Sequence, residues 1–230
     1  MKRVRSLVFH TIDASENFVD KQEFFDAISA FRFDENLGFG LSIQDDNDDT
    51  FKIKVVKRSA TFINDYDNEL NEFVRKQIYV FSDFQFCLDF KLNIVYVYGG
   101  ISHINYVKYI LRNVIKTSFN LVPIELTAYS FYEMLLEKEI SNKIENITIS
   151  HFNYQNELVG RFSGIVINQA AGLNLLETYK TDIVKVSFLI QVSETEQFIL
   201  HALPNGALKF LSNSDDVEFL TDYLKNIIFS

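Results

Sequence analysis

The amino-acid sequence predicts an α+β fold, in which antiparallel or mixed sheets built from hairpins carry four to five packed helices. The chain has 230 residues, and 47% of them are hydrophobic, so it can bury a large core without a metal ion or a disulfide. Strand-like segments follow one another across polar turns instead of alternating regularly with helices. We expect two α+β halves, residues 1–98 and 99–230, or one continuous domain.

The first half is predicted to contain five strands and two helices. Phe24, Ile28 and Phe31 are spaced for a helix over 21–31, and Asp20 is its expected N-terminal cap. The polar tract 44–50 predicts a turn, so the strands on either side should form a hairpin. A short second helix is expected over 65–76. The strands are expected over 3–12, 39–43, 51–63, 77–90 and 92–98.

The second half is predicted to contain three helices and four strands. The clearest helix covers 102–118, a second covers 127–140, and a third runs from the expected cap Ser214 to about residue 228. A tight turn is expected at Pro204-Asn205-Gly206. The strands are expected over 144–152, 161–168, 183–192 and 197–210.

Charge is distributed unevenly along the chain. It has 22 basic and 31 acidic residues, a net charge of −9. The window 51–116 holds ten basic and six acidic residues, a net +4, which leaves −13 for the remainder. Such acidity opposes avid binding to nucleic acid unless the positive charge is gathered on one surface.

Two groups of basic residues have a regular spacing. Lys52, Lys54 and Arg58 share one parity in a predicted strand, so they should point to one face of it. Lys108, Arg112 and Lys116 repeat every four residues and should form a stripe on the helix over 102–118. Both arrangements are suited to holding phosphates without regard to base sequence. The alternative is that the stripe is simply a solvated helix face.

Other motifs carry weaker signals. Gly99, Gly100 and Ser102 lie where a strand turns into a helix, which can present N–H groups to an anion, although Ser102 can equally be a helix cap. No His or Cys residues have the spacing of metal ligands, and no nucleophile–base set is apparent. We therefore expect no metal, no cofactor and no enzymatic activity.

The sequence also suggests where the protein works. The apolar stretch behind the basic N-terminus is too short for a signal peptide, and no run of apolar residues would span a membrane. The lone cysteine, Cys87, fits a reducing compartment, so we expect a cytoplasmic protein. Its residue usage suggests an AT-rich genome, as in a bacterium or a phage.

Four stretches share an order of elements with a known family: the opening strand Val4-Arg5-Ser6-Leu7-Val8-Phe9-His10, the helix that ends in Ala27-Ile28-Ser29-Ala30-Phe31, the stretch 86–126, and the late strands over 181–211, which include Asn205-Gly206-Ala207-Leu208-Lys209-Phe210. In this order the chain resembles the recombination-associated RdgC family of bacterial DNA-binding proteins. The resemblance implies a non-enzymatic protein that dimerises into a ring around duplex DNA, with Lys108, Arg112 and Lys116 facing the DNA. This chain departs from the family in its acidity and its shorter length.

These observations lead to two hypotheses about function. The first is a largely sequence-independent DNA-binding protein of bacterial or phage genome maintenance, recombination or defence, which forms homo-oligomers such as a homodimer. The second is a protein-interaction or regulatory subunit of a prokaryotic multi-component system, with no direct contact to nucleic acid. Neither hypothesis involves a membrane.

Overall fold

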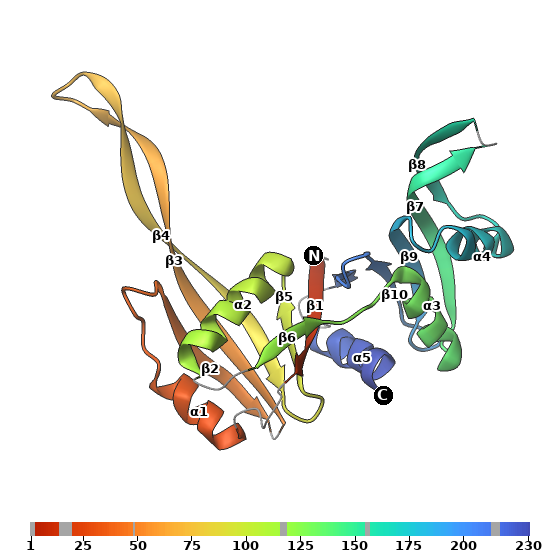
Figure 1. The fold of residues 1–230 in the computed structure, drawn as a ribbon, viewed down its shortest axis with the longest axis horizontal. Helices are drawn as coiled ribbons and strands as arrows, with labels where there is room; N and C mark the ends of the chain where they lie inside the picture. The colour runs from red at the N-terminus through yellow and green to blue at the C-terminus, as the bar shows by residue number, and fades with distance from the viewer. Residues whose placement is uncertain (1–2, 14–19, 48, 116–118, 155–156, 213–216) are drawn as a thin grey trace. The chain divides into compact units, whose positions relative to one another are not determined.

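The computed structural model describes residues 3–13, 20–47, 49–115, 119–154, 157–212 and 217–230. Over these residues the chain forms five helices and an eleven-stranded antiparallel sheet, with 28% helix and 49% strand (Figure 1). The predicted α+β class is therefore confirmed.

The chain forms two compact units that interleave along the sequence. Unit 1 comprises Met1–Thr11, Val97–Ile104 and Val122–Ser230, whereas unit 2 comprises Ile12–Tyr96 and Asn105–Leu121. The boundary expected between residues 98 and 99 thus falls inside a segment of unit 1.

Unit 2 is a sheet with the strand order β2-β3-β4-β5, covered on one face by two helices. Phe51, Ile53 and Val55 of β3 are buried on the covered face, as their alternation predicts. Phe24 of α1 stacks on Phe51 at 5.7 Å between ring centroids, and Tyr106 of α2 contacts Phe84 at 6.0 Å. The elements are α1 (Lys21–Ala30), β2 (Phe39–Asn47), β3 (Thr50–Asp67), β4 (Glu72–Asp89), β5 (Ile94–Tyr98) and α2 (Ile101–Val114).

The hairpin of β3 and β4 is the most extended feature of unit 2. Each strand has 18 residues, and their far ends form a twisted two-stranded ribbon that reaches beyond the other elements of this unit (Figure 1). We call residues 58–81, from the Arg58–Phe81 pair outward, the arm. The predicted helix over 65–76 is wrong, because this segment is the end of the arm. The Asp67 side chain accepts the N–H groups of Glu69 and Leu70, and Asn71 adopts a φ of 56°, so local turn chemistry closes a hairpin here.

Unit 1 is a sheet with the strand order β1-β11-β10-β9-β7-β8, in which β6 also pairs with β1. One row of its residues, Phe210, Leu200, Phe188 and Ile144, crosses four neighbouring strands and is almost completely buried. Helix α3 packs on this row, with Phe131 at 5.8 Å from Phe188. The elements are β1 (Arg3–Asp13), β6 (Asn120–Pro123), α3 (Ala128–Glu137), β7 (Asn142–Tyr154), β8 (Leu158–Ile165), α4 (Gln169–Thr178), β9 (Ile183–Gln191), β10 (Gln197–Ala202), β11 (Leu208–Ser212) and α5 (Val217–Phe229).

One predicted helix cap is confirmed and another is wrong, and two short elements were not predicted. Asp20 caps α1, as predicted, by accepting the N–H groups of Gln22 and Glu23. Helix α2 begins at Ile101, so Ser102 lies inside its first turn and does not cap it. Helix α4 and the short strand β6 were not predicted. The expected cap Ser214 lies outside the described residues.

Candidate functional site

The three basic residues predicted on β3 do share one face of the hairpin. Lys52, Lys54 and Arg58 alternate with the buried core residues and are half-buried, on the face opposite to the helices. Lys54 Nζ lies 3.1 Å from a carboxylate oxygen of Asp83, and the Arg58 guanidinium forms an ion pair with Glu35. Because exposed ion pairs contribute only about 0–1 kcal/mol, a phosphate could replace either carboxylate at small cost.

The basic helix residues lie elsewhere. Helix α2 buries Ile104, Val107 and Leu111 and leaves Lys108 half-buried and Arg112 exposed. Tyr106 packs this helix onto the covered face of the sheet, so the helix stripe and the β3 residues lie on opposite sides of the sheet. The structure therefore does not join the two predicted groups into one surface. Lys116, the third member of the stripe, lies outside the described residues.

At the start of α2, where a weak anion site was predicted, two backbone N–H groups already have acceptors within the protein. The Gly99 N–H donates to the Ser6 carbonyl oxygen at 2.8 Å, as part of strand pairing. A side chain at Gly99 would bring its Cβ within 2.7 Å of His103 Nδ1, so close packing explains this glycine. Gly100 accepts the His103 N–H at 2.9 Å, and Ser102 is exposed. The N–H groups of Gly99 and His103 are therefore engaged within the protein, and the anion site stays a prediction.

The arm presents an aromatic surface that the sequence analysis missed. Opposed residues in an antiparallel pair share one face, and the register of β3 and β4 therefore places exposed aromatic and arginine side chains together. Phe62 is 52% exposed, Phe73 73% and Tyr79 58%. We call this the aromatic face of the arm, and it consists of Arg58, Phe62, Tyr66, Phe73, Arg75, Tyr79 and Phe81.

The side chains of the aromatic face are organised by their own contacts. The Arg75 guanidinium lies 4.2 Å from the centre of the Phe62 ring, and that of Arg58 lies 4.7 Å from the Tyr79 ring. Tyr66 and Phe73 meet edge to face at 5.2 Å. Such cation–π contacts contribute about 0.5–1 kcal/mol at exposed sites and hold the arginines against the rings.

Charges within the arm are segregated between its two faces. Asp65, Asp67 and Glu72 have the opposite parity to the aromatic residues, and Glu69 lies in the turn between the strands. Lys76 is on the same face as Asp65, and its Nζ lies 3.5 Å from Oδ2 of that carboxylate. Within the described arm, the aromatic face thus carries guanidinium groups and no carboxylate.

Unit 1 has a second polar surface, on the sheet face opposite to its core row. The register brings Ser6, Lys209, His201, Ser187 and Asn146 into one line across five strands, which we call the polar row. His201 Nδ1 lies 2.8 Å from the Ser187 hydroxyl. Partial burial, and then the nearby cations Lys185 and Lys209, hold the pKa of His201 below its usual value.

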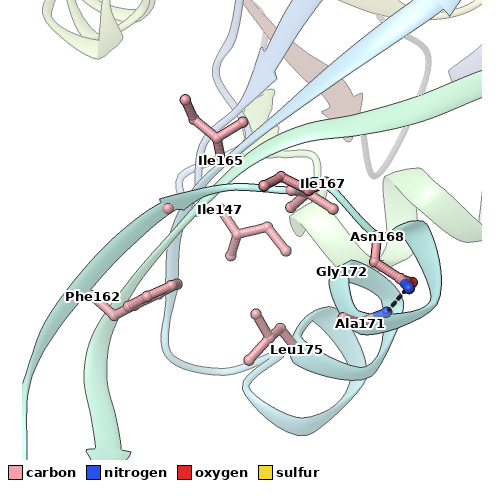
Figure 2. A pocket seen from close by; sticks show the side chains of 10 residues that line it. Ile147, Phe162, Ile165, Ile167, Asn168, Ala171, Gly172 and Leu175 are labelled. Carbon is pink, nitrogen blue, oxygen red and sulfur yellow. Dashed lines mark hydrogen bonds between the residues drawn. The ribbon is translucent and has the colours of Figure 1, made fainter.

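A small apolar pocket lies between α4 and the β7–β8 hairpin (Figure 2). Its volume is about 100 Å³, and its walls include Ile147, Phe162 and Leu175. Asn168 is the single polar side chain among its described lining residues, and it accepts the Ala171 N–H at 3.2 Å. The pocket therefore provides an apolar cleft and no group for proton transfer.

Comparison with known proteins assigns no family. No family model matches the chain, and no curated protein matches it.

Within the described residues, no three His, Cys, Asp or Glu side chains are grouped so that they could hold a metal ion. None of the helices in that part of the chain is long and apolar enough to cross a membrane.

The aromatic face could have been found from the sequence by testing for strand alternation. Phe73, Arg75, Tyr79 and Phe81 all have one parity, which is typical of one face of a strand. The expectation of a helix over 65–76 interrupted that pattern. The polar row has no comparable signal, because its members come from five strands that are separated along the sequence.

Proposed function

We propose that this chain is a non-enzymatic DNA-binding protein that holds single-stranded DNA, largely without regard to sequence, on the aromatic face of the arm. The observation that carries the proposal is the combination of exposed rings and Arg75 on a part of the hairpin whose own residues on that face include no carboxylate. Arg58, at the base of this face, is paired with Glu35. It meets the condition under which an acidic protein can bind nucleic acid, namely segregated positive charge.

The chemistry of each group supports this function. Exposed aromatic rings stack on unpaired bases, which contributes about 1–3 kcal/mol per base and tolerates any sequence. Arginines contact phosphates, and Lys52 and Lys54 continue the same face of the hairpin toward its base. Duplex DNA hides its base faces in the stack, so we expect single strands to bind more tightly than duplexes.

The proposal changes the role expected for the basic helix. Arg112 lies on the other side of the sheet from Lys52 and Lys54, so it would not contribute to the same stretch of DNA. A contribution from α2 would require a second, separate contact. The resemblance to the RdgC family agrees with the class of function and not with the helix as its main contact.

Two neighbouring residues of β4 give a matched test. Arg75 lies on the aromatic face and Lys76 on the opposite face, and both side chains are exposed. Arg75→Glu and Lys76→Glu change the net charge by the same amount. Fluorescence anisotropy with a labelled oligonucleotide, titrated at several salt concentrations, should show about a tenfold or larger loss of affinity for Arg75→Glu and a much smaller loss for Lys76→Glu.

The salt dependence separates the outcomes. Phosphate contacts make the logarithm of the affinity fall linearly with the logarithm of salt concentration, and loss of one contact should reduce that slope by about one. Equal losses for the two variants would show only long-range repulsion and would contradict the proposed face. Absence of binding by the unaltered protein at low salt would exclude the function.

A second candidate function is protein binding by strand addition to β8. This strand ends the strand order of unit 1, and its surroundings expose large apolar side chains, with Ile165 78% and Ile167 96% exposed. An uncovered apolar edge can pair with a strand of another protein. A co-purifying partner that is lost from the Ile165→Lys, Ile167→Lys double variant, without loss of DNA binding, would support this candidate.

A further inference from the structure

The polar row of unit 1 combines cations and hydroxyl groups on one sheet face. Lys209 is directly opposite His201 in the register of β10 and β11, and Ser187 is opposite His201 on its other side. Lys185 lies two residues before Ser187 on β9 and therefore points to the same face. Diagonal neighbours of this kind are about 7–8 Å apart, so both ammonium groups can reach the region around the imidazole.

Among the described residues that the register pairs around Ser187 on this face, none is a carboxylate. The row next to Ser187 contains Lys185, Thr148 and Ser163, with the two hydroxyl oxygens 3.0 Å apart. Beyond it on the other side, the register pairs Leu189 with Lys143, a further cation. The members of these rows are neutral or positive.

The sheet is built so that this face stays separate from the core. Along β9 and β10, the buried residues Phe188 and Leu200 alternate with the polar row. Helix α3 packs on Phe188, and α5 packs on Phe198 through Tyr223 at 6.1 Å, both on the core side. Lys185, His201 and Lys209 are all half-buried. Partial burial strengthens electrostatic interactions relative to those in bulk water.

We propose that the polar row, together with Lys185 of the neighbouring row, binds a phosphate-type oxyanion, held by the side chains of Lys185, His201 and Lys209. The imidazole uses Nδ1 for Ser187, which leaves Nε2 to donate to the ligand, while the two ammonium groups supply charge. This inference is independent of the proposed function of the arm. The phosphate could be a free ion or a phosphodiester of nucleic acid, since both present the same oxygens.

The pKa of His201 should differ between the empty site and the site with a bound anion. Burial, and to a lesser extent the charges of Lys185 and Lys209, hold the pKa of His201 below its usual value. A bound dianion should reverse this effect and raise the pKa of His201, because it favours the imidazolium form. The ligand thus reports its own binding through one residue.

The experiment is an NMR pH titration of the His201 ring in the full chain. It is recorded in sodium phosphate and in sodium chloride at equal ionic strength, which separates specific binding from screening. We expect a higher pKa of His201 in phosphate than in chloride. Lys185→Gln and Lys209→Gln should each raise the pKa in chloride and abolish the difference between the salts. Lys180→Gln, in the same unit but over the Tyr129 ring, is the matched control.

Two further measurements show whether the bound phosphate is a free ion or part of nucleic acid, and they test the proposal itself. An oligonucleotide is added to the Arg75→Glu variant, in which the arm is impaired, and the His201 resonance is followed. A response to free phosphate supports a small-molecule site, and a response to the oligonucleotide alone supports a backbone contact. Identical His201 titrations in all media would overturn the proposal, whatever the result for the arm.

Discussion

Gly40 shows how one residue fixes the packing of unit 2. A Cβ at this position would lie 2.9 Å from the Phe33 Cα, a backbone atom that cannot turn aside. The segment around Phe33 therefore lies directly on β2, and it brings Glu35 to Arg58.

We expect Gly40→Ala to destabilise the protein by about 1–3 kcal/mol, as overpacking in a tight site does. Urea denaturation would measure the change. Gly160→Ala is the control, because a Cβ at Gly160 meets nothing within 4 Å. A loss of similar size in both variants would contradict the close-packing argument.

His201 makes stability depend on pH in a defined direction. Its pKa is lowered in the folded protein by partial burial and by Lys185 and Lys209, so the unfolded chain binds the proton more readily. Stability is therefore expected to fall as the pH decreases through about 6.5, the usual pKa of histidine, toward the lowered value.

The measurement is the urea midpoint at pH 8 and at pH 5.5. The unaltered protein should lose stability between pH 8 and pH 5.5. The His201→Gln variant should lose less, because it lacks the contribution of this histidine. The other three histidines remain in both proteins and cancel in the comparison. If the variant loses as much stability on acidification as the parent, His201 does not carry the effect.

At the scale of elements, the arm contributes surface and little core. The hydrophobic core of unit 2 is provided by residues near the base of the hairpin, including Phe51 and Phe86, whereas Phe62 and Phe73 remain exposed. The arm can therefore be shortened without opening the core.

We predict that the arm can be removed with little loss of stability. Thr61 and Ile78 are directly opposite each other, so residues 62–77 can be replaced by Asn-Gly, which favours a two-residue hairpin turn. The melting temperature should change little, while affinity for single-stranded DNA should fall at least tenfold. Phe86→Ala, by contrast, should cost about 3–5 kcal/mol because it leaves a cavity in the core. A shortened protein that still binds DNA with full affinity would place the site elsewhere.

The elements also show what can be read from the sequence and what cannot. Strand parity correctly placed Lys52, Lys54 and Arg58 on one face, because alternation is a local property. Whether Lys108 and Arg112 join them depends on which face of the sheet α2 covers, and no local pattern records this. In the segment 65–76, Tyr66, Leu70 and Phe73 are also compatible with helical spacing, and the hairpin is decided by the turn and by pairing with β3.

At the scale of the whole molecule, the division into units does not follow the order of the sequence. Strand β1 comes from the start of the chain and pairs with β11 near its end, with Leu7 opposite Leu208. Both residues are fully buried. A cut near residue 98 therefore separates β1, the strand that pairs with both β11 and β6, from the rest of unit 1.

We expect a fragment containing only residues 99–230 to lack a stable fold. Limited proteolysis and circular dichroism should show rapid cleavage and loss of cooperative unfolding. Adding a separate fragment of residues 1–98 should restore protection, because it supplies β1. A fragment 99–230 that unfolds cooperatively alone would show that β1 is dispensable.

The pairing of β1 with β11 also has a consequence for synthesis on the ribosome. The first strand emerges about 200 residues before its partner, and translation at roughly 5–20 residues per second makes it wait about 10–40 seconds. During that interval the side chains of Leu7 and Phe9, which are buried in the folded protein, are still exposed. The segment can therefore pair with a strand of another nascent chain. The arginines at positions 3 and 5 would then act as gatekeepers, keeping the waiting segment soluble until the last strand arrives.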